Sequence, residues 1–230
     1  PQPQSVPMWV RSQGTVEPRT ESALVPEVSG RVVWVSPALV SGGFFDEGEP
    51  LLRVETRSYE MAVSRAKAAV ARARGEVDFA ADELARQKKM SARNVASPAQ
   101  LSAARRNDEV AKANLTDAAI GLEQASWDLE RTTVIAPYRG RVRVESVDVG
   151  QVVSPSAPVA TLYATDYAEI RLPVADQQLA FLNLPDHPNV DTDALPEVIL
   201  RARFAGKENT WRGLVVRTEG EIDPKSRMVH

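Results

Sequence analysis

The chain has 230 residues, of which 43% are apolar and 26% are charged, and its formal net charge is −3. The length allows more than one folding unit, and the small negative charge provides no general attraction to nucleic acid or anionic membrane. The absence of cysteine excludes a disulfide framework and thiolate chemistry, and no apolar run is long enough to span a bilayer.

The first seven residues, Pro1 to Pro7, lack the charged-then-apolar pattern of a signal peptide. We therefore expect any signal or membrane anchor to lie upstream of this sequence. The following stretch, Met8 to Val16, suits a β-strand. The last residues, Met228 to His230, resemble the start of a strand, which suggests a C-terminal truncation.

An internal repeat is split by about 110 residues. Gly30-Arg31-Val32 in the first copy matches Gly140-Arg141-Val142 in the second, and the match resumes after a two-residue change of offset. The resumed pairs are Gly42 with Gly150, Phe45 with Val153, Gly48 with Ser156, Leu51 with Val159, and Val54 with Leu162. Both copies have the short apolar stretches and turn signals of strands joined by tight turns. We predict two half-sheets, residues 23–56 and 132–165, that pack face to face; the alternative is a chance likeness between β segments rich in Val and Gly.

Residues 57–131, between the copies, are rich in strong helix formers. Apolar positions recur at steps of three and four, with large and small residues alternating, and only Asp108 breaks the second series. The first series is Val63, Ala66, Val70, Ala73, Val77, Ala80 and Leu84; the second is Leu101, Ala104, Ala111, Leu115, Ala118, Leu122, Ala125 and Leu129. This pattern predicts two helices that pack closely along one narrow seam.

The break between the two helices falls at Asn94-Val95-Ala96. Ser97 is placed as an N-cap, Pro98 follows at the first helical position, and Gln100 can complete a capping box. The short connection favours antiparallel arms, each about 50 Å long. We expect the hairpin to project from the β-domain; a stalk without further role, or a homodimerising coiled coil, is the alternative.

Residues 166–230 suggest a separate small β-domain, which the N-terminal segment 1–22 would join. Strands are predicted at Glu169–Val174, Val198–Phe204 and Trp211–Arg217, with a short helix at Ala175–Leu182 and a turn at Gly206–Asn209. We expect Trp9 and Trp211 to lie in its core.

Three stretches make the chain resemble the periplasmic adaptor (membrane fusion protein) family of tripartite efflux pumps, of the resistance–nodulation–division type. Val25–Val32 is similar to the family's first lipoyl half, Leu129–Val142 to its return into the second half, and Asp223–Val229 to a segment of its β-barrel domain. The resemblance implies an elongated α+β multidomain fold: a β-barrel domain, a lipoyl-like β-sandwich made of split half-motifs, and an inserted antiparallel coiled-coil hairpin.

The resemblance also implies a non-enzymatic function, namely to bridge an inner-membrane transporter of the resistance–nodulation–division type to an outer-membrane channel of the TolC type, for export of small molecules. It further implies a periplasmic location at the inner membrane and self-association into a ring, hexameric in the family.

The family's hairpin tip contacts the channel through an Arg, a Leu one turn later and a Ser across the loop. Here Arg86 and Ser97 match and Met90 replaces the Leu, which conserves volume. The candidate partner-binding residues are Arg86, Met90, Arg93, Asn94, Val95, Ala96, Ser97 and Gln100.

Several other functions find little support in the residues. A lipoyl or biotinyl carrier needs a lysine at the turn between the half-repeats, and residues 23–56 and 132–165 contain none. We expect no catalytic site, no cofactor and no metal site, because the only histidines are His187 and His230 and no phosphate-binding glycine pattern follows a strand. The alternatives left open are a metal-ion efflux adaptor, although the four methionines are scattered, an adaptor of another transporter class, and a self-associating coiled-coil scaffold.

Overall fold

The computed structural model describes residues 9–93, 95–182, 195–219, 223 and 227–229. The chain divides into two compact units. One is Arg19–Tyr167, and the other combines Pro1–Pro18 with Ala168–His230. No helix in the described ranges is long and apolar enough to cross a membrane.

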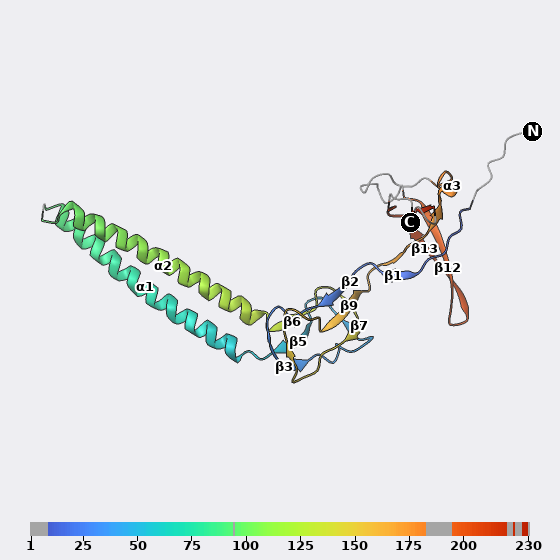
Figure 1. The fold of residues 1–230 in the computed structure, drawn as a ribbon, viewed down its shortest axis with the longest axis horizontal. Coiled ribbons are helices and arrows are strands. Elements are labelled where there is room, and N and C mark those ends of the chain that lie inside the picture. The colour runs from blue at the N-terminus through green and yellow to red at the C-terminus, as the bar shows by residue number, and fades with distance from the viewer. Residues whose placement is uncertain (1–8, 94, 183–194, 220–222, 224–226, 230) are drawn as a thin grey trace, which may run out of the picture. The chain divides into compact units, whose positions relative to one another are not determined.

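The β-domain of the first unit consists of two antiparallel four-stranded sheets (Figure 1). The order in one sheet is β2 (Glu21–Leu24), β9 (Ala160–Ala164), β7 (Gly140–Glu145) and β4 (Phe44–Phe45); in the other it is β6 (Thr133–Ile135), β5 (Pro50–Val54), β3 (Gly30–Val35) and β8 (Val152–Val153). Each sheet takes two strands from each half-motif. Exchanging the halves converts one strand order into the other, so the predicted repeat is confirmed. The prediction that each copy forms a half-sheet of its own was wrong, because strands of both copies pair within each sheet.

Backbone hydrogen bonds are also equivalent in the two halves. Gly42 N donates to Val142 O at 2.8 Å, and Gly150 N donates to Val32 O at 2.8 Å. These bonds place Gly42 and Gly150 at equivalent turns. The sequence comparison predicts that the spacing between matching residues of the two copies changes by two residues. This change lies just before these turns, where the first copy has two more residues than the second and buries Leu39.

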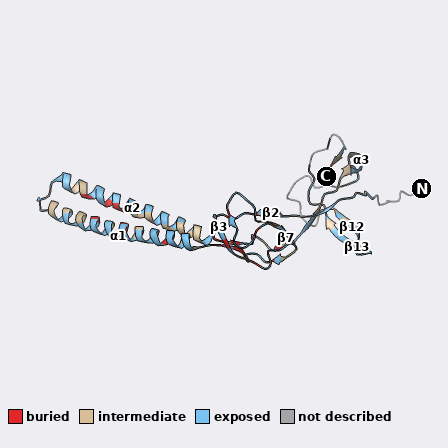
Figure 2. Ribbon diagram, turned by 60° about the horizontal axis from the view of Figure 1, so that its bottom comes forward, coloured by how far each residue is buried: buried red, intermediate tan, exposed pale blue. Residues whose placement is uncertain are grey.

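One hydrophobic core lies between the two sheets. Val32, Leu51, Leu52 and Leu162 are at most 1% exposed and belong to a single buried cluster. All members of this cluster come from the two half-motifs and the turns beside them, and none comes from the helices. Figure 2 shows buried residues of the β-domain in red. The β-domain therefore has its own core, independent of the inserted segment.

The inserted segment forms two antiparallel helices, α1 (Arg57–Ser91) and α2 (Pro98–Glu130), that lie side by side (Figure 1). Every predicted seam position is buried or half-buried, so the predicted hairpin is confirmed. The fully buried positions are Val63, Ala73 and Ala80 on α1 and Ala104, Asp108 and Ala111 on α2. Asp108, which breaks the apolar pattern, nevertheless lies inside the seam. Its carboxylate Oδ2 binds Lys112 Nζ at 2.6 Å, which partly neutralises the buried charge.

The hairpin joins the β-domain through a few polar contacts. Val54 N donates to Thr132 O at 2.8 Å, which pairs the two chain segments where they leave the sheets. Tyr59 donates its hydroxyl to Ser29 O at 2.6 Å, and Arg131 Nε lies 2.9 Å from Glu27 Oε2. Both helix bases are thus tied to the loop between β2 and β3.

The described residues of the second unit form three separate two-stranded pairings. They are β1 (Val16–Pro18) with β10 (Ala168–Ile170), β11 (Val174–Ala175) with β14 (Met228–Val229), and β12 (Glu197–Phe204) with β13 (Lys207–Leu214). The strand predicted at Glu169–Val174 is therefore two short strands, and the strand predicted at Met8–Val16 begins only at Val16. The predicted helix shortens to α3 (Asp176–Leu179), followed by hydrogen-bonded turns up to Leu182.

Two further predictions for this unit were wrong. The turn between β12 and β13 consists of Ala205 and Gly206, with φ of 50° and 79°, and the following residues Lys207 to Asn209 belong to β13. Two residues with positive φ form the tight turn that matches the twist of a β-hairpin. Trp9 and Trp211 are 73% and 49% exposed and do not lie in a core.

Candidate functional site

The candidate site lies at the tip of the hairpin, where α1 ends at Ser91. Backbone hydrogen bonds from Arg93 N and Val95 N both reach Met90 O, at 3.1 and 3.0 Å. These bonds turn the chain out of the helix. Lys88 and Lys89 occupy the last turn of α1, where positive charge offsets the negative end of the helix dipole.

The start of α2 is defined by the predicted capping box. Gln100 N donates to Ser97 Oγ at 3.2 Å, and Ser97 N donates to Gln100 Oε1 at 2.8 Å. Pro98 stands at the first helical position, where no N–H is needed. The side chains of Ser97 and Gln100 are therefore engaged with the backbone, although both residues are exposed.

A shallow depression of about 500 Å³ lies on the α1 side of the tip. Seven residues line it: Asp82, Ala85, Arg86, Lys89, Met90, Arg93 and Val95. Three of them are cationic and one is acidic, so the surface has an excess of positive charge. Val95 is 67% exposed and Met90 is half-buried, so apolar contact area is available beside the charges.

The predicted tip residues fall into two groups. Arg86, Met90, Arg93 and Val95 line the same depression, whereas Ser97 and Gln100 form the cap of α2. Ala96 is half-buried between the two groups, and Asn94 lies outside the described residues. Arg86 also pairs with Glu83, one turn earlier on α1.

The sequence prediction missed Asp82, Ala85 and Lys89, which complete the depression. Asp82 and Lys89 lie four residues before and three residues after Arg86, so they share its helix face. Extending the candidate set along this face would have found them. The resulting surface can donate hydrogen bonds to carbonyl or carboxylate groups of a partner and cover an apolar side chain.

The described part of the chain brings together no group of three or more His, Cys, Asp or Glu side chains that could hold a metal ion. A shifted pKa lies outside the tip, on α2. The pKa of Lys112 is raised, chiefly by its hydrogen bond to Asp108, with Glu109 adding a smaller electrostatic effect. This shift favours the charged form of Lys112. The ion pair between Lys112 and Asp108 belongs to the structure of the hairpin and not to the tip.

Known proteins share both the sequence pattern and the fold. The chain is 22% identical to multidrug resistance protein MdtA of Proteus mirabilis over 227 residues, which cover 96% of this chain and 52% of the relative. The chain thus spans about half the length of the curated relatives it matches. No protein-family profile matches the sequence.

Solved structures show the same fold. MacA of Actinobacillus actinomycetemcomitans gives a TM-score of 0.66 at 15% identity, covering 94% of this chain and 68% of that one. The membrane fusion protein Spr0693 of Streptococcus pneumoniae gives 0.65 at 18% identity, covering 94% and 85%. The fold of this chain is therefore similar to that of these proteins, one of which is named a membrane fusion protein. The predicted resemblance to the periplasmic adaptors of efflux pumps is confirmed, in sequence as well as in fold.

Proposed function

We propose that this chain is the periplasmic adaptor subunit of a tripartite efflux pump, which bridges an inner-membrane transporter to an outer-membrane channel for export of small molecules. The observation that carries the proposal is a helical hairpin inserted between two halves of one β-domain, whose core is closed without it. Relatives named multidrug resistance proteins align with nearly the whole chain. The hairpin thus provides reach, and the β-domain a rigid base.

We assign residues 23–56 and 132–165 to a lipoyl-like domain, 57–131 to the hairpin, and 1–22 with 166–230 to a β-barrel domain. The interleaved sheets of the two half-motifs support the first assignment. We assign the β-barrel domain to the transporter side and propose a transporter of the resistance–nodulation–division type in the inner membrane. The protein would act by geometry and assembly, as a ring of six copies in the periplasm, and we assign it no catalytic step.

The tip would bind a TolC-type channel in the outer membrane. We propose Arg86, Met90, Arg93, Asn94, Val95, Ala96, Ser97 and Gln100 as the contact residues. The shared depression of Arg86, Met90, Arg93 and Val95 supports this, since it combines three cationic side chains with apolar area at the far end of the helices. Hydrogen-bond acceptors on a partner would be recognised there together with an apolar side chain.

The test is a charged substitution at the tip in cells that express the whole pump. The substitutions Val95→Glu and Ala96→Glu place bulk and negative charge against the docking surface, while both residues lie outside the helices. We expect mild crosslinking to capture the outer-membrane channel with the unchanged protein and with an Ala119→Glu control. Ala119 is exposed in the middle of α2, far from the tip.

Loss of channel capture and of efflux in the tip variant alone, with an unchanged melting curve, supports the adaptor function. Equal capture by the tip variant and the control contradicts the tip assignment. Failure of the unchanged protein to capture any channel or transporter overturns the proposed function and leaves a coiled-coil scaffold as the better description.

A further inference from the structure

The seam between α1 and α2 becomes polar toward the tip. From Val63 to Leu84 every seam position of α1 is apolar, but the next two positions, in the same steps of three and four, are Gln87 and Ser91, and both are half-buried. On α2 the seam is interrupted by Asp108, which is 3% exposed and lies about 15 Å along the helix from its start. The polar seam positions therefore lie in the part of the hairpin near the tip.

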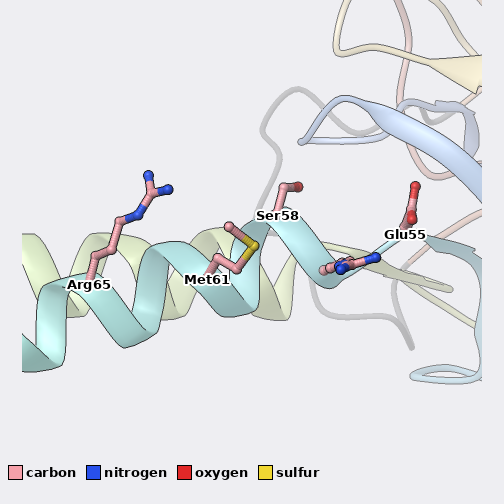
Figure 3. A pocket seen from close by; sticks show the side chains of 5 residues that line it. Glu55, Ser58, Met61 and Arg65 are labelled. Atoms are coloured by element: carbon pink, nitrogen blue, oxygen red, sulfur yellow. The ribbon is translucent and has the colours of Figure 1, made fainter.

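At the base of the hairpin the polar side chains lie outside the seam. Figure 3 shows Ser58 and Arg65 among the side chains that line a shallow depression on α1, and both residues are exposed. Val63, between them in the chain, is the seam residue and is buried. The seam thus has an apolar residue at its base, where the helices leave the β-domain, and polar residues near its tip.

Gln87 has an unsatisfied polar atom in the closed seam. Its Nε2 donates to Glu83 Oε1 at 2.8 Å, one turn earlier on the same helix. Its own Oε1 is buried, and no described group donates a hydrogen bond to it. Reversing the amide would place Oε1 against the carboxylate of Glu83 and bury the NH₂ group instead, so it would not remove the defect. A buried polar atom without a partner favours any state in which water reaches it.

Asp108 gains no polar partner from its contact with α1. Its carboxylate binds Lys112 Nζ, one turn later on α2 itself. Among the described residues, no side-chain hydrogen bond or ion pair joins α1 to α2. The bonds of Gln87 and Asp108 therefore survive when the helices separate, whereas the loss of hydration opposes only the closed state. Apolar residues such as Leu84 and Leu101 must hold this part of the seam together against that effect.

We propose that the two helices separate reversibly on the tip side of Asp108 while the rest of the seam stays closed, and that the separated form binds the partner channel. Local opening of this kind is expected where buried apolar contacts are few. Arg86 and Met90, which line the depression at the tip, lie on either side of Gln87, so the opening moves their surface relative to the capped start of α2. The binding step rests on the proposed function; the opening is a property of this chain alone.

Thiol labelling measures the opening directly, because the chain has no cysteine. Ala104 and Ala111 are both buried on α2 and lie one heptad apart, on the tip side and the base side of Asp108. We expect Ala104→Cys in the whole chain to react with a thiol reagent at least tenfold faster than Ala111→Cys, each relative to its own rate in urea. Equal relative rates, or a faster reaction of Ala111→Cys, overturn the proposal.

Apolar substitution of the two polar residues should close the tip. In the Ala104→Cys chain we expect Gln87→Leu combined with Asp108→Leu to slow labelling at least fivefold. The matched control is Lys88→Leu combined with Asn107→Leu, since these residues are exposed neighbours of the two on the same helices. It should leave the rate within about twofold. An unchanged rate in the seam variant, or equal slowing in the control, contradicts the proposal.

Channel capture tests whether the opening serves binding. We expect the variant with both Gln87→Leu and Asp108→Leu to capture the channel at least threefold less than the unchanged chain. Adding Leu84→Ala removes apolar area from the same part of the seam, so it should restore both fast labelling and capture. Full capture by the closed variant overturns the role of the opening in binding. Restored labelling without restored capture does the same, and indicates direct contact by the polar residues.

These outcomes are distinguishable from a failure of the proposed function. If the unchanged chain captures no channel, the adaptor function is wrong, whatever the labelling rates are. If it captures the channel while Ala104→Cys and Ala111→Cys react alike, only the opening is wrong.

Discussion

Arg141 connects its own half of the repeat to a turn of the other half, since its Nε and Nη2 donate to the carbonyl oxygen of Gly42 at 3.2 and 2.9 Å. Arg31, the equivalent residue of the first half, donates from Nη1 to Gly150 O at 3.0 Å. Both glycines have positive φ, 82° and 94°, which a residue with a Cβ rarely adopts. Each half-motif therefore holds the turn of its counterpart, and the arginines of the two Gly-Arg-Val triplets have equivalent structural roles.

The two arginines should differ in their effect on stability. Arg141 is half-buried, makes two hydrogen bonds and lies 4.2 Å from the ring centre of Phe44, whereas Arg31 is exposed and makes one such bond. We expect Arg141→Ala to lower the free energy of unfolding of the β-domain by about 1–3 kcal/mol, and Arg31→Ala by less than about 1 kcal/mol. Chemical denaturation followed by the fluorescence of Trp34, in a background where the other three tryptophans are replaced by Phe, measures both; equal losses would contradict the asymmetry.

The glycines of the same triplets also differ. A Cβ on Gly140 would lie 2.2 Å from the backbone oxygen of Tyr163, and a Cβ on Gly30 would lie 2.3 Å from a methyl group of Val54. The side chain of Val54 can rotate or shift, but the backbone of β9 is held in its sheet. We expect Gly140→Ala to cost more than about 2 kcal/mol of stability and Gly30→Ala to cost less. Comparing their thermal unfolding tests this order, and a reversed order would refute it.

The sequence was sufficient to predict the central β-domain and the hairpin because both repeat. Two copies of one β pattern had to share an architecture, and seam residues such as Val63 and Leu122 recur at a fixed spacing. Ser97 and Gln100 were predictable as a cap because a capping box depends on residues only three positions apart.

The terminal unit was less predictable, since it lacks both a repeat and a strict period. Trp9 and Trp211 were expected in a core on their apolar character alone, and both are exposed. At the tip, Arg86 and Met90 were identified by resemblance, and their grouping with Lys89 emerged only from the helix geometry. Asp108 was identified as a break in the pattern, and its partner Lys112 became evident in the structure.

Ser97→Ala should separate the capping role of Ser97 from partner contact. Loss of the hydrogen bond from Gln100 N leaves an unsatisfied donor at the start of α2, which costs about 1 kcal/mol of helix stability. Gln100→Ala removes the reciprocal bond of the same cap. Circular dichroism during thermal unfolding measures the cap in both variants. Channel capture that falls for Ser97→Ala under conditions where the helix remains folded indicates direct contact, and unchanged capture assigns Ser97 to the cap alone.

Asp108 should lower the stability of the hairpin. Its side chain is 5% exposed and is paired with Lys112, in a seam that Leu115 and Leu122 continue with apolar residues. Because desolvating a buried ion pair offsets most of its attraction, Asp108→Leu should raise the free energy of unfolding by on the order of 1 kcal/mol. Lys112→Met should lower it, since Asp108 then stays buried without its partner.

The same pair gives a defined pH dependence. The pKa of Lys112 is raised by its hydrogen bond to Asp108, so its stabilising effect is complete below the usual lysine pKa and disappears only as the pH rises through the higher value of the folded state. The stability difference between Lys112→Met and the unchanged chain should therefore stay constant across the neutral range and shrink at strongly alkaline pH. Thermal unfolding at a series of pH values measures this difference; a change near neutrality would show that another group governs the seam.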